Sequence, residues 1–141
     1  MKIYLASSMS GEKRTNMLKA VEILREMGHE VYNPCEHTIP HAWDYPNDEW
    51  GLMVFTNDVS AIQEADIVVA LSYGRMSTAG ANWEMGFAYG INKKVIIVEM
   101  TDEIMSLMVS NGRWATVRGL EGLKNYDFKT MPKLRTKTEQ K

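Results

Sequence analysis

Apolar and polar residues follow one another in blocks whose periods predict strands separated by helices. Continuous apolar runs predict strands at residues 3–7, 29–32, 66–71, 94–99 and, more briefly, 114–117. Apolar positions at helical spacing, or a capping residue before them, predict helices at residues 11–27, 50–64, 82–90 and, from Thr101 or Asp102, to 109. Apolar strands that alternate with helices are typical of a parallel sheet covered on both faces. The expected fold is therefore α/β, a doubly wound, mainly parallel sheet of about five strands of the flavodoxin or Rossmann kind.

Length and composition fit one globular domain. The chain has 141 residues, of which 45% are hydrophobic and 24% charged, ordinary values for such a domain. We expect a single domain over residues 1–130 and a disordered tail over the Lys- and Thr-rich residues 131–141. Residues 33–48 have no period, and a loop of that length inside a compact domain is often functional.

Charge, hydropathy and cysteine usage narrow the possible partners. The net charge of −2 offers no electrostatic basis for binding a nucleic acid polymer or an acidic membrane. No apolar run approaches the roughly 20 residues that span a bilayer, and the N-terminal run is too short for a signal peptide. Cys35 is the single cysteine, so a reducing, cytoplasmic location is expected. His37 and His41 have no zinc-type spacing with Cys35, and we expect neither a metal nor another cofactor.

The stretch after the strand at 66–71 carries the clearest chemistry. Residues 77–88 (STAGANWEMGFA) form a small-residue turn that opens into an apolar helix with Glu84 in its first turns. This pattern predicts a carboxylate at the carboxyl edge of a parallel sheet, where open α/β folds bind ligands. N–H groups of the turn and of the helix N-terminus can hold an anion beside it. Such a carboxylate is suited to attack on a sugar carbon.

Four pieces of the sequence, taken in order, indicate a family. They are Ile3-Tyr4-Leu5 followed by Ser8, TNDVSAI at 56–62 leading into ADI at 65–67, Gly80 with EMGFA at 84–88, and MSLMV at 105–109. In this order and spacing, the chain resembles the nucleoside 2-deoxyribosyltransferase family, including its branch of 2′-deoxynucleoside 5′-monophosphate N-hydrolases. The resemblance implies an enzyme that acts on an N-glycosidic bond and an oligomer whose subunits share active sites.

The resemblance implies catalytic roles for three residues. Glu84 matches the family nucleophile, and a carboxylate beneath the sugar can capture the oxocarbenium-like carbon covalently. Tyr4 matches the tyrosine that orients the nucleophile, and Asp58 matches the acid that contacts the base and helps to move its proton. The plain structural alternatives are solvated helix carboxylates for Glu84 and Asp58 and a half-buried strand residue for Tyr4.

Thr78 distinguishes this chain from the base-exchanging transferases that it resembles. Those enzymes have an aspartate six residues before the nucleophile, which contacts the free 5′-hydroxyl, and a neighbouring subunit's asparagine in the place of Ser106. The monophosphate hydrolases have serine at both places, which suits a 5′-phosphate because an aspartate would repel it. The hydrolases also have an arginine near position 10, whose task here would fall to Lys13, Arg14 or Arg75.

Further residues are expected to complete the substrate site. Ser8 and Ser10, after the first strand, would extend the phosphate cradle, although every hydroxyl named here has an alternative as a turn or cap residue. Trp50 matches a family tryptophan and is the best candidate to stack on the base, and Gly80 and Asn82 are expected to contact substrate from the turn. The other aromatic candidates for stacking are Trp43, Phe55 and Trp83.

The leading hypothesis is cleavage of 2′-deoxynucleoside 5′-monophosphates through a glycosyl–Glu84 intermediate, completed by water with retention of configuration. Base exchange on free deoxynucleosides is the close alternative. A non-catalytic nucleotide sensor and a purely structural flavodoxin-like domain are the others. The expected partners are a small-molecule nucleoside or nucleotide and further copies of the chain. The copies would form a homodimer or larger assembly through the Met-rich residues 100–108, with Ser106 projecting across.

Overall fold

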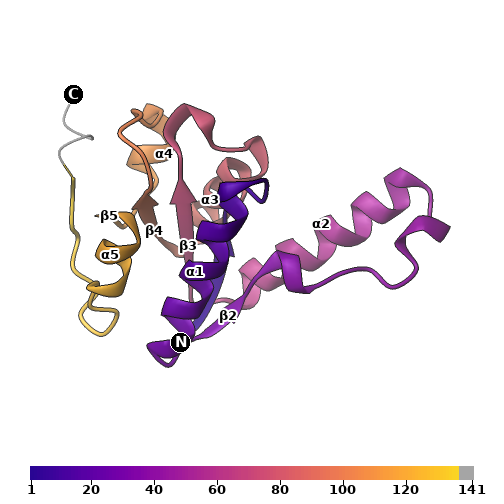
Figure 1. Ribbon diagram of the computed structural model, residues 1–141, viewed down its shortest axis with the longest axis horizontal. Helices are drawn as coiled ribbons and strands as arrows, with labels where there is room; N and C mark the ends of the chain where they lie inside the picture. Colours follow the sequence, from indigo (N-terminus) through magenta and orange to yellow (C-terminus); the bar gives the residue numbers. More distant parts are fainter. Residues whose placement is uncertain (137–141) are drawn as a thin grey trace.

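The computed structural model describes residues 1–136, which form one five-stranded parallel sheet (Figure 1). The strands are β1 (Lys2–Ala6), β2 (Glu30–Tyr32), β3 (Ile67–Ser72), β4 (Lys94–Glu99) and β5 (Ala115–Arg118). Their order, β2-β1-β3-β4-β5, confirms the α/β prediction and matches the flavodoxin-like type of doubly wound sheet. The chain leaves β1 toward β2 and returns to the other side of β1 as β3. The topological switch point therefore lies between β1 and β3.

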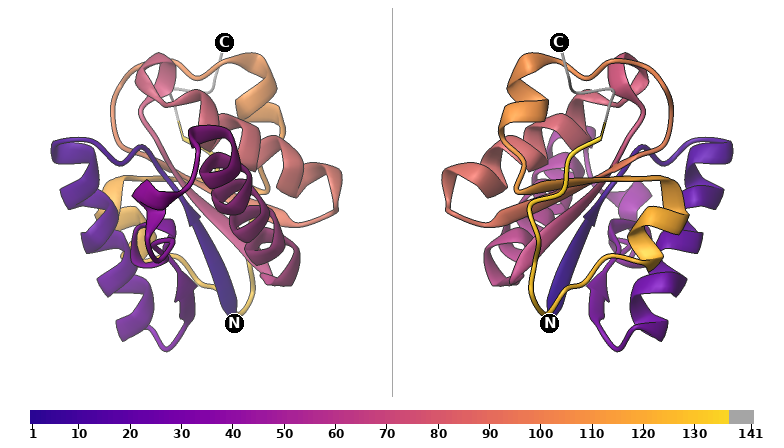
Figure 2. Two further views of the ribbon diagram at one scale, coloured as in Figure 1. Left: turned by 90° about the vertical axis from the view of Figure 1, so that its right-hand side faces the viewer. Right: turned by 90° about the vertical axis from the view of Figure 1, so that its left-hand side faces the viewer.

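Helices cover both faces of the sheet, as the continuous apolar strands require (Figure 2). One face packs against α1 (Glu12–Glu26) and α5 (Gly119–Lys124), and the other packs against α2 (Asn47–Glu64) and α3 (Ala79–Gly90). Beside α3 on that second face lies α4 (Leu107–Asn111). β3 is buried along its whole length, which explains its unbroken apolar sequence.

Three of the expected helices begin at least three residues away from their predicted start, and α2 begins at Asn47 rather than at residue 50. α3 begins at Ala79 rather than at residue 82, because the Thr78 hydroxyl caps it by accepting the Ala81 N–H at 3.3 Å. The helix expected from residue 101 to 109 is wrong over its first half, since residues 101–106 form bends and α4 starts only at Leu107. The helix α5 was not predicted from the sequence; it has six residues, two of which are glycines.

Part of the tail expected over residues 131–141 lies outside the described residues. The part up to Thr136 runs back along β5, where the Thr116 N–H donates to the Leu134 carbonyl at 2.9 Å. It ends at the sheet's carboxyl edge, where the Thr136 hydroxyl donates to Glu99 at 2.9 Å. This segment therefore covers the edge strand β5.

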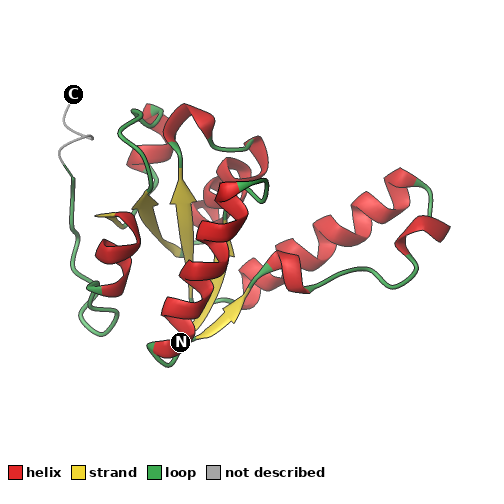
Figure 3. Ribbon diagram, in the orientation of Figure 1, coloured by secondary structure: helices red, strands yellow, loops and turns green. Residues whose placement is uncertain are grey.

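The N-terminal half of α2 extends away from the sheet, together with the 3₁₀ turn Ala42–Asp44 (Figures 1 and 3). Trp43 is 89% exposed and Leu52 64% exposed, whereas Ile62 near the other end of the helix is fully buried. α2 is thus anchored by its C-terminal half. Within residues 1–136, no helix has both the length and the apolar character needed to cross a membrane.

Candidate active site

A phenol and a carboxylate from different elements meet near the switch point of the sheet. Tyr4 is fully buried in β1, and its hydroxyl donates a hydrogen bond to Oε2 of Glu84 in the second turn of α3. Burial raises the pKa of Tyr4, and the charge of Glu84 raises it further. The phenol therefore keeps its proton and remains a donor to Glu84.

Burial also changes the ionisation of Glu84 itself. It raises the pKa of Glu84 to about 7, although the hydrogen bond from Tyr4 acts in the opposite direction. The nearby carboxylate of Asp58, on α2, adds to the rise. Burial likewise raises the pKa of Asp58. Two carboxyl groups with raised pKa values in one place are typical of a functional site rather than of a solvated helix surface.

Asp58 and Glu84 share a cavity of about 530 Å³ between α2 and α3. Much of its lining is apolar and comes from Met9, Val54, Phe55, Val59, Ile62 and Trp83. The rings of Phe55 and Trp83 meet edge to face with their centroids 5.3 Å apart. Apolar and aromatic walls with a few polar groups are typical of small-molecule sites.

The N-terminus of α3 borders the same cavity through Ala79 and Gly80. The first N–H groups of a helix have no intrahelical acceptor and favour an anion. Two of the predicted hydroxyl residues brace this end of the helix. Thr78 is its N-cap, and the buried Ser8 accepts the Thr78 backbone N–H at 3.1 Å. Thr78 therefore has the cap role that we considered as the alternative, and its hydroxyl can still donate.

Ser10 and the three candidate cations lie outside the cavity lining. Ser10 is exposed in the loop before α1. Lys13 Nζ donates to the Met76 carbonyl at 2.5 Å, and Arg14 Nη1 lies 3.4 Å from the Cys35 sulfur. Arg75 is exposed. Among the described residues, no lysine or arginine lines the space beside Glu84.

A second, larger cavity of about 740 Å³ lies between α3 and α4. It contains Asn82 and also Ser106, which caps α4 by accepting the Val109 N–H at 3.2 Å. Trp83 borders both cavities. Within one copy of the chain, Asn82 and Ser106 are therefore separated from the cavity that holds Glu84.

Trp50 lies on the projecting part of α2 and is 42% exposed. The cavity lining includes its neighbours Gly51, Val54 and Phe55 but not Trp50 itself. Of the four aromatic candidates for stacking, Phe55 and Trp83 line the cavity of the carboxylates.

Tyr32 is a site residue that the sequence reasoning missed. It is the register partner of Tyr4 in the β1–β2 pair, and the two rings stack with centroids 5.5 Å apart. His37 stacks on Tyr32 at 4.1 Å. Burial raises the pKa of Tyr32 to about 12, and the phenol hydrogen-bonds to Asp58. Its place beside Tyr4 depends on the register of β1 and β2, which no local sequence pattern shows. In the described part of the chain, no group of three or more His, Cys, Asp or Glu side chains could hold a metal ion.

Comparisons with known proteins show which family and which solved structures the chain is similar to. The sequence matches the family model for nucleoside 2-deoxyribosyltransferase over residues 3–132. Among solved structures, a 2-deoxyribosyltransferase from the psychrotolerant bacterium Bacillus psychrosaccharolyticus is 33% identical, with a TM-score of 0.88. That alignment covers 96% of this chain and 99% of the Bacillus chain.

Two more distant structures share the fold. A conserved protein from Enterococcus faecalis V583 is 20% identical over 88% of this chain and 97% of its own, with a TM-score of 0.71. The Clostridium botulinum CMP N-glycosidase BcmB is 17% identical over 86% of this chain and 94% of its own, with a TM-score of 0.60. No curated protein matches the chain by sequence.

Proposed function

The chain belongs to the nucleoside 2-deoxyribosyltransferase family, and from this we propose that it cleaves 2′-deoxynucleoside 5′-monophosphates to free base and sugar phosphate. Enzymes of this family act on glycosyl groups. The identity of the substrate, a 5′-monophosphate, and of the acceptor, water, is our proposal. The observation that carries the proposal is the contact of the Tyr4 hydroxyl with Glu84, beside Asp58, at one cavity.

The chemistry requires two displacements at C1′ of the sugar. The Glu84 carboxylate attacks C1′, the bond to the base nitrogen breaks, and its electron pair leaves with the base. In the reactive form of the pair Glu84 is ionised and the proton lies on Asp58, which gives it to the departing base. Water then attacks C1′ from the side that the base has left and releases Glu84. The proton of that water returns to Asp58, so the cycle closes with retained configuration. Tyr4 donates to Glu84 throughout and fixes its orientation.

The substrate's 5′ end is proposed to lie at the N-terminus of α3. Ala79 and Gly80, the first residues of α3, border the cavity, and the N–H groups of a helix N-terminus favour an anion. Thr78, at the helix start, brings a hydroxyl rather than a carboxylate, so a phosphate would meet donors and no repelling charge.

Base exchange on free deoxynucleosides is the second candidate. The 33% identical Bacillus protein is a 2-deoxyribosyltransferase, and no described lysine or arginine lines the cavity to neutralise a phosphate. In that reaction a second base replaces water in the second displacement, and the roles of Glu84, Tyr4 and Asp58 are unchanged.

Two incubations separate these candidates. The enzyme is given each 2′-deoxynucleoside 5′-monophosphate alone and, separately, deoxycytidine with adenine. Release of base from a monophosphate supports the first candidate, and appearance of deoxyadenosine supports the second. Thr78→Asp should move the preference from nucleotide toward nucleoside, and an unchanged preference would remove the phosphate proposal.

Intact-protein mass spectrometry tests the covalent step. A pentose or pentose-phosphate adduct on the wild-type chain, absent from Glu84→Gln, is the expected result. Tight binding without turnover, equal in both proteins, would instead support a non-catalytic nucleotide sensor.

We also propose that the active enzyme is a homodimer or larger assembly in which Ser106 serves a neighbouring subunit. The cavity that contains Ser106 is bordered by exposed apolar side chains, with Met108 86% and Tyr89 62% exposed. Such a surface favours burial against another protein. We expect Glu84→Gln and Ser106→Trp each to be inactive. Mixing the two variants should restore part of the activity, because a mixed assembly contains sites with an intact Glu84 from one subunit and an intact Ser106 from the other. An active monomer in sedimentation would contradict the shared site.

A further inference from the structure

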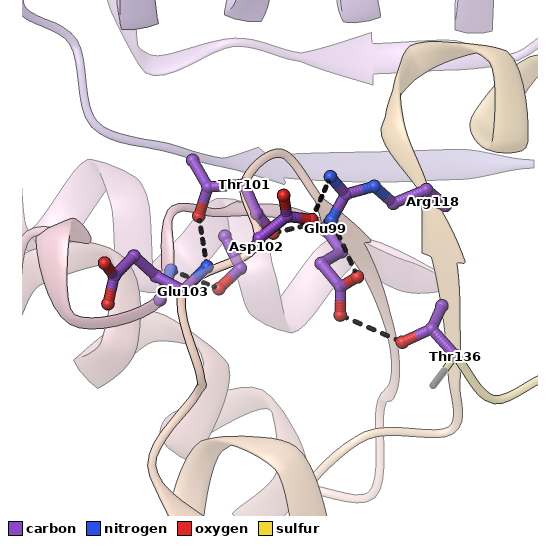
Figure 4. Close-up of polar contacts among 8 residues, drawn as sticks. Glu99, Thr101, Asp102, Glu103, Arg118 and Thr136 are labelled. Carbon is purple, nitrogen blue, oxygen red and sulfur yellow. Dashed lines mark hydrogen bonds and ion pairs between the residues drawn. The ribbon is translucent and has the colours of Figure 1, made fainter. Parts of the chain in front are cut away.

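The carboxyl edge of the sheet holds a further carboxylate, Glu99 at the end of β4 (Figure 4). It is only 3% exposed. Arg118 at the end of β5 donates from Nη1 to Oε1 of Glu99 at 2.9 Å, and the Thr136 hydroxyl donates to Oε2 at 2.9 Å. Since a buried carboxylate is costly without charged partners, this ion pair fixes the position of Arg118.

Arg118 also contacts the loop between β4 and α4 (Figure 4). Its Nη1 donates to the Thr101 carbonyl at 2.6 Å, and its Nη2 donates to Oδ1 of Asp102 at 2.7 Å. Thr101 Oγ1 in turn accepts the Glu103 N–H at 3.3 Å. A planar guanidinium with several fixed donors can hold three acceptors at once, which a lysine ammonium does less well. Arg118 thus ties residues 101–103 to the ends of β4 and β5.

The same loop is packed directly against the connection between β3 and α3. Gly74 has a positive φ of 60°, and a Cβ atom added there would lie 2.6 Å from Cβ of Glu103 and 2.7 Å from its carbonyl oxygen. Gly74 begins the 3₁₀ turn Gly74–Met76, which leads through Ser77 to the N-cap Thr78. A shift of residues 101–103 would therefore be passed on to the N-terminus of α3.

We propose that Arg118 is a positioning residue for substrate binding, which holds residues 101–103 against Gly74 and so fixes the N-terminus of α3. This inference rests on the proposed function, in which that helix end holds the 5′-phosphate. Arg118 does not line the catalytic cavity, so its effect passes through the loop. Glu84 is held separately by Tyr4. Loosening the loop should therefore weaken binding far more than it slows the chemical step.

Arg118→Lys is the informative variant, because it keeps a positive charge beside Glu99 but cannot hold all three acceptors. We expect KM for the 5′-monophosphate to rise about tenfold while kcat stays within about twofold. Gly74→Ala should give the same pattern, since its Cβ would push the loop away from the other side. Arg135→Met is the matched control: Arg135 donates to the Trp114 and Leu134 carbonyls, which do not belong to the loop at residues 101–103, and its loss should leave both constants unchanged.

Hydrogen exchange gives a readout that does not depend on activity. Backbone amides of residues 74–80 should exchange faster in Arg118→Lys than in the wild-type protein or Arg135→Met. Unchanged exchange, an unchanged KM, or a fall in kcat alone would overturn the role of Arg118. If the wild-type protein cleaves neither nucleosides nor nucleotides, the proposed function fails, and the exchange comparison alone still decides whether Arg118 fixes this helix end.

Discussion

Glu84 on α3 and Glu99 at the end of β4 are two carboxylates with different surroundings. Glu99, at the β4–β5 end, faces the guanidinium of Arg118 and the hydroxyl of Thr136. Glu84, near β1 and β3, faces the uncharged hydroxyl of Tyr4, and the carboxylate of Asp58 is nearby. Within residues 1–136, no cation is paired with Glu84.

The difference separates a structural carboxylate from a reactive one. An ion pair with an arginine suits a group that holds loops together, because the charge remains fixed and satisfied. A half-buried carboxylate without a cation, such as Glu84, is less stable in its charged form. That weakly stabilised charged form is the one that attacks as a nucleophile. The carboxylate whose charged form is destabilised is therefore Glu84, at the β1–β3 end of the sheet, where the cavity lies.

The largest effect should come from Glu84→Gln. We expect the rate of base release to fall by about 10³-fold or more, because an amide cannot form the glycosyl ester. The fold should be retained, since glutamine can still accept the Tyr4 hydrogen bond. Base release measured by chromatography and unfolding in urea would test both statements. Activity of Glu84→Gln within tenfold of wild type would contradict the assignment of Glu84 as the reactive carboxylate.

The next effect is a pH dependence of stability that belongs to Glu84. Its pKa is about 7 in the fold against 4.5 in the unfolded chain, so the folded state binds the proton more tightly. The stability contributed is fully present below pH 4.5 and is lost as the pH rises through 7, by about 3 kcal/mol at most. Glu84→Gln should lack this loss. The free energy of unfolding of the variant minus that of the wild type should therefore increase between pH 4 and 8. A difference that stays constant across this range would be inconsistent with the raised pKa.

Arg118→Met should destabilise the fold at the other carboxylate, Glu99. Glu99 would remain buried without its guanidinium, and the free energy of unfolding should fall by about 2 kcal/mol, less than for a fully buried pair because Arg118 is half exposed. Urea unfolding measures the loss. The double variant Glu99→Gln/Arg118→Met should recover part of it, and no recovery would mean that the ion pair is not the cause.

The smallest effect is expected from Tyr4→Phe. Because the hydrogen bond from Tyr4 lowers the pKa of Glu84, its loss should raise that pKa further. The rise of kcat/KM with pH, which follows ionisation of Glu84, should shift upward by about one pH unit. A pH–rate profile of wild type and variant would show this. A profile shifted to lower pH would contradict the assigned hydrogen bond.

The fold could be predicted from the sequence largely because of its buried strands. Unbroken apolar runs identify β3 and β4. α5 was missed because Gly119 and Gly122 interrupt its short apolar pattern. Gly119 has a φ of 63° at the start of the helix, and a Cβ on Gly122 would lie 3.1 Å from Val117. Both glycines serve packing and backbone geometry that no local pattern shows.

The candidate site shows a similar limit. The pairing of Tyr4 with Glu84 followed from the family resemblance, and the structure brings the two side chains together. The path of residues 101–106 could not be predicted from the sequence, because Arg118 holds Thr101 and Asp102 from a strand many residues away. Long-range contacts of this kind override the capping signal that predicted a helix there. Tyr32 was missed for the same reason, since its role depends on strand register.

Trp83 has a practical consequence, because its indole borders both the cavity of Glu84 and the cavity of Ser106. Ligand entry on one side and subunit contact on the other would each change the solvent around one fluorophore. A chain in which Trp43, Trp50 and Trp114 are replaced by phenylalanine would emit from Trp83 alone. Its emission could then follow substrate arrival and subunit assembly in real time, without a label.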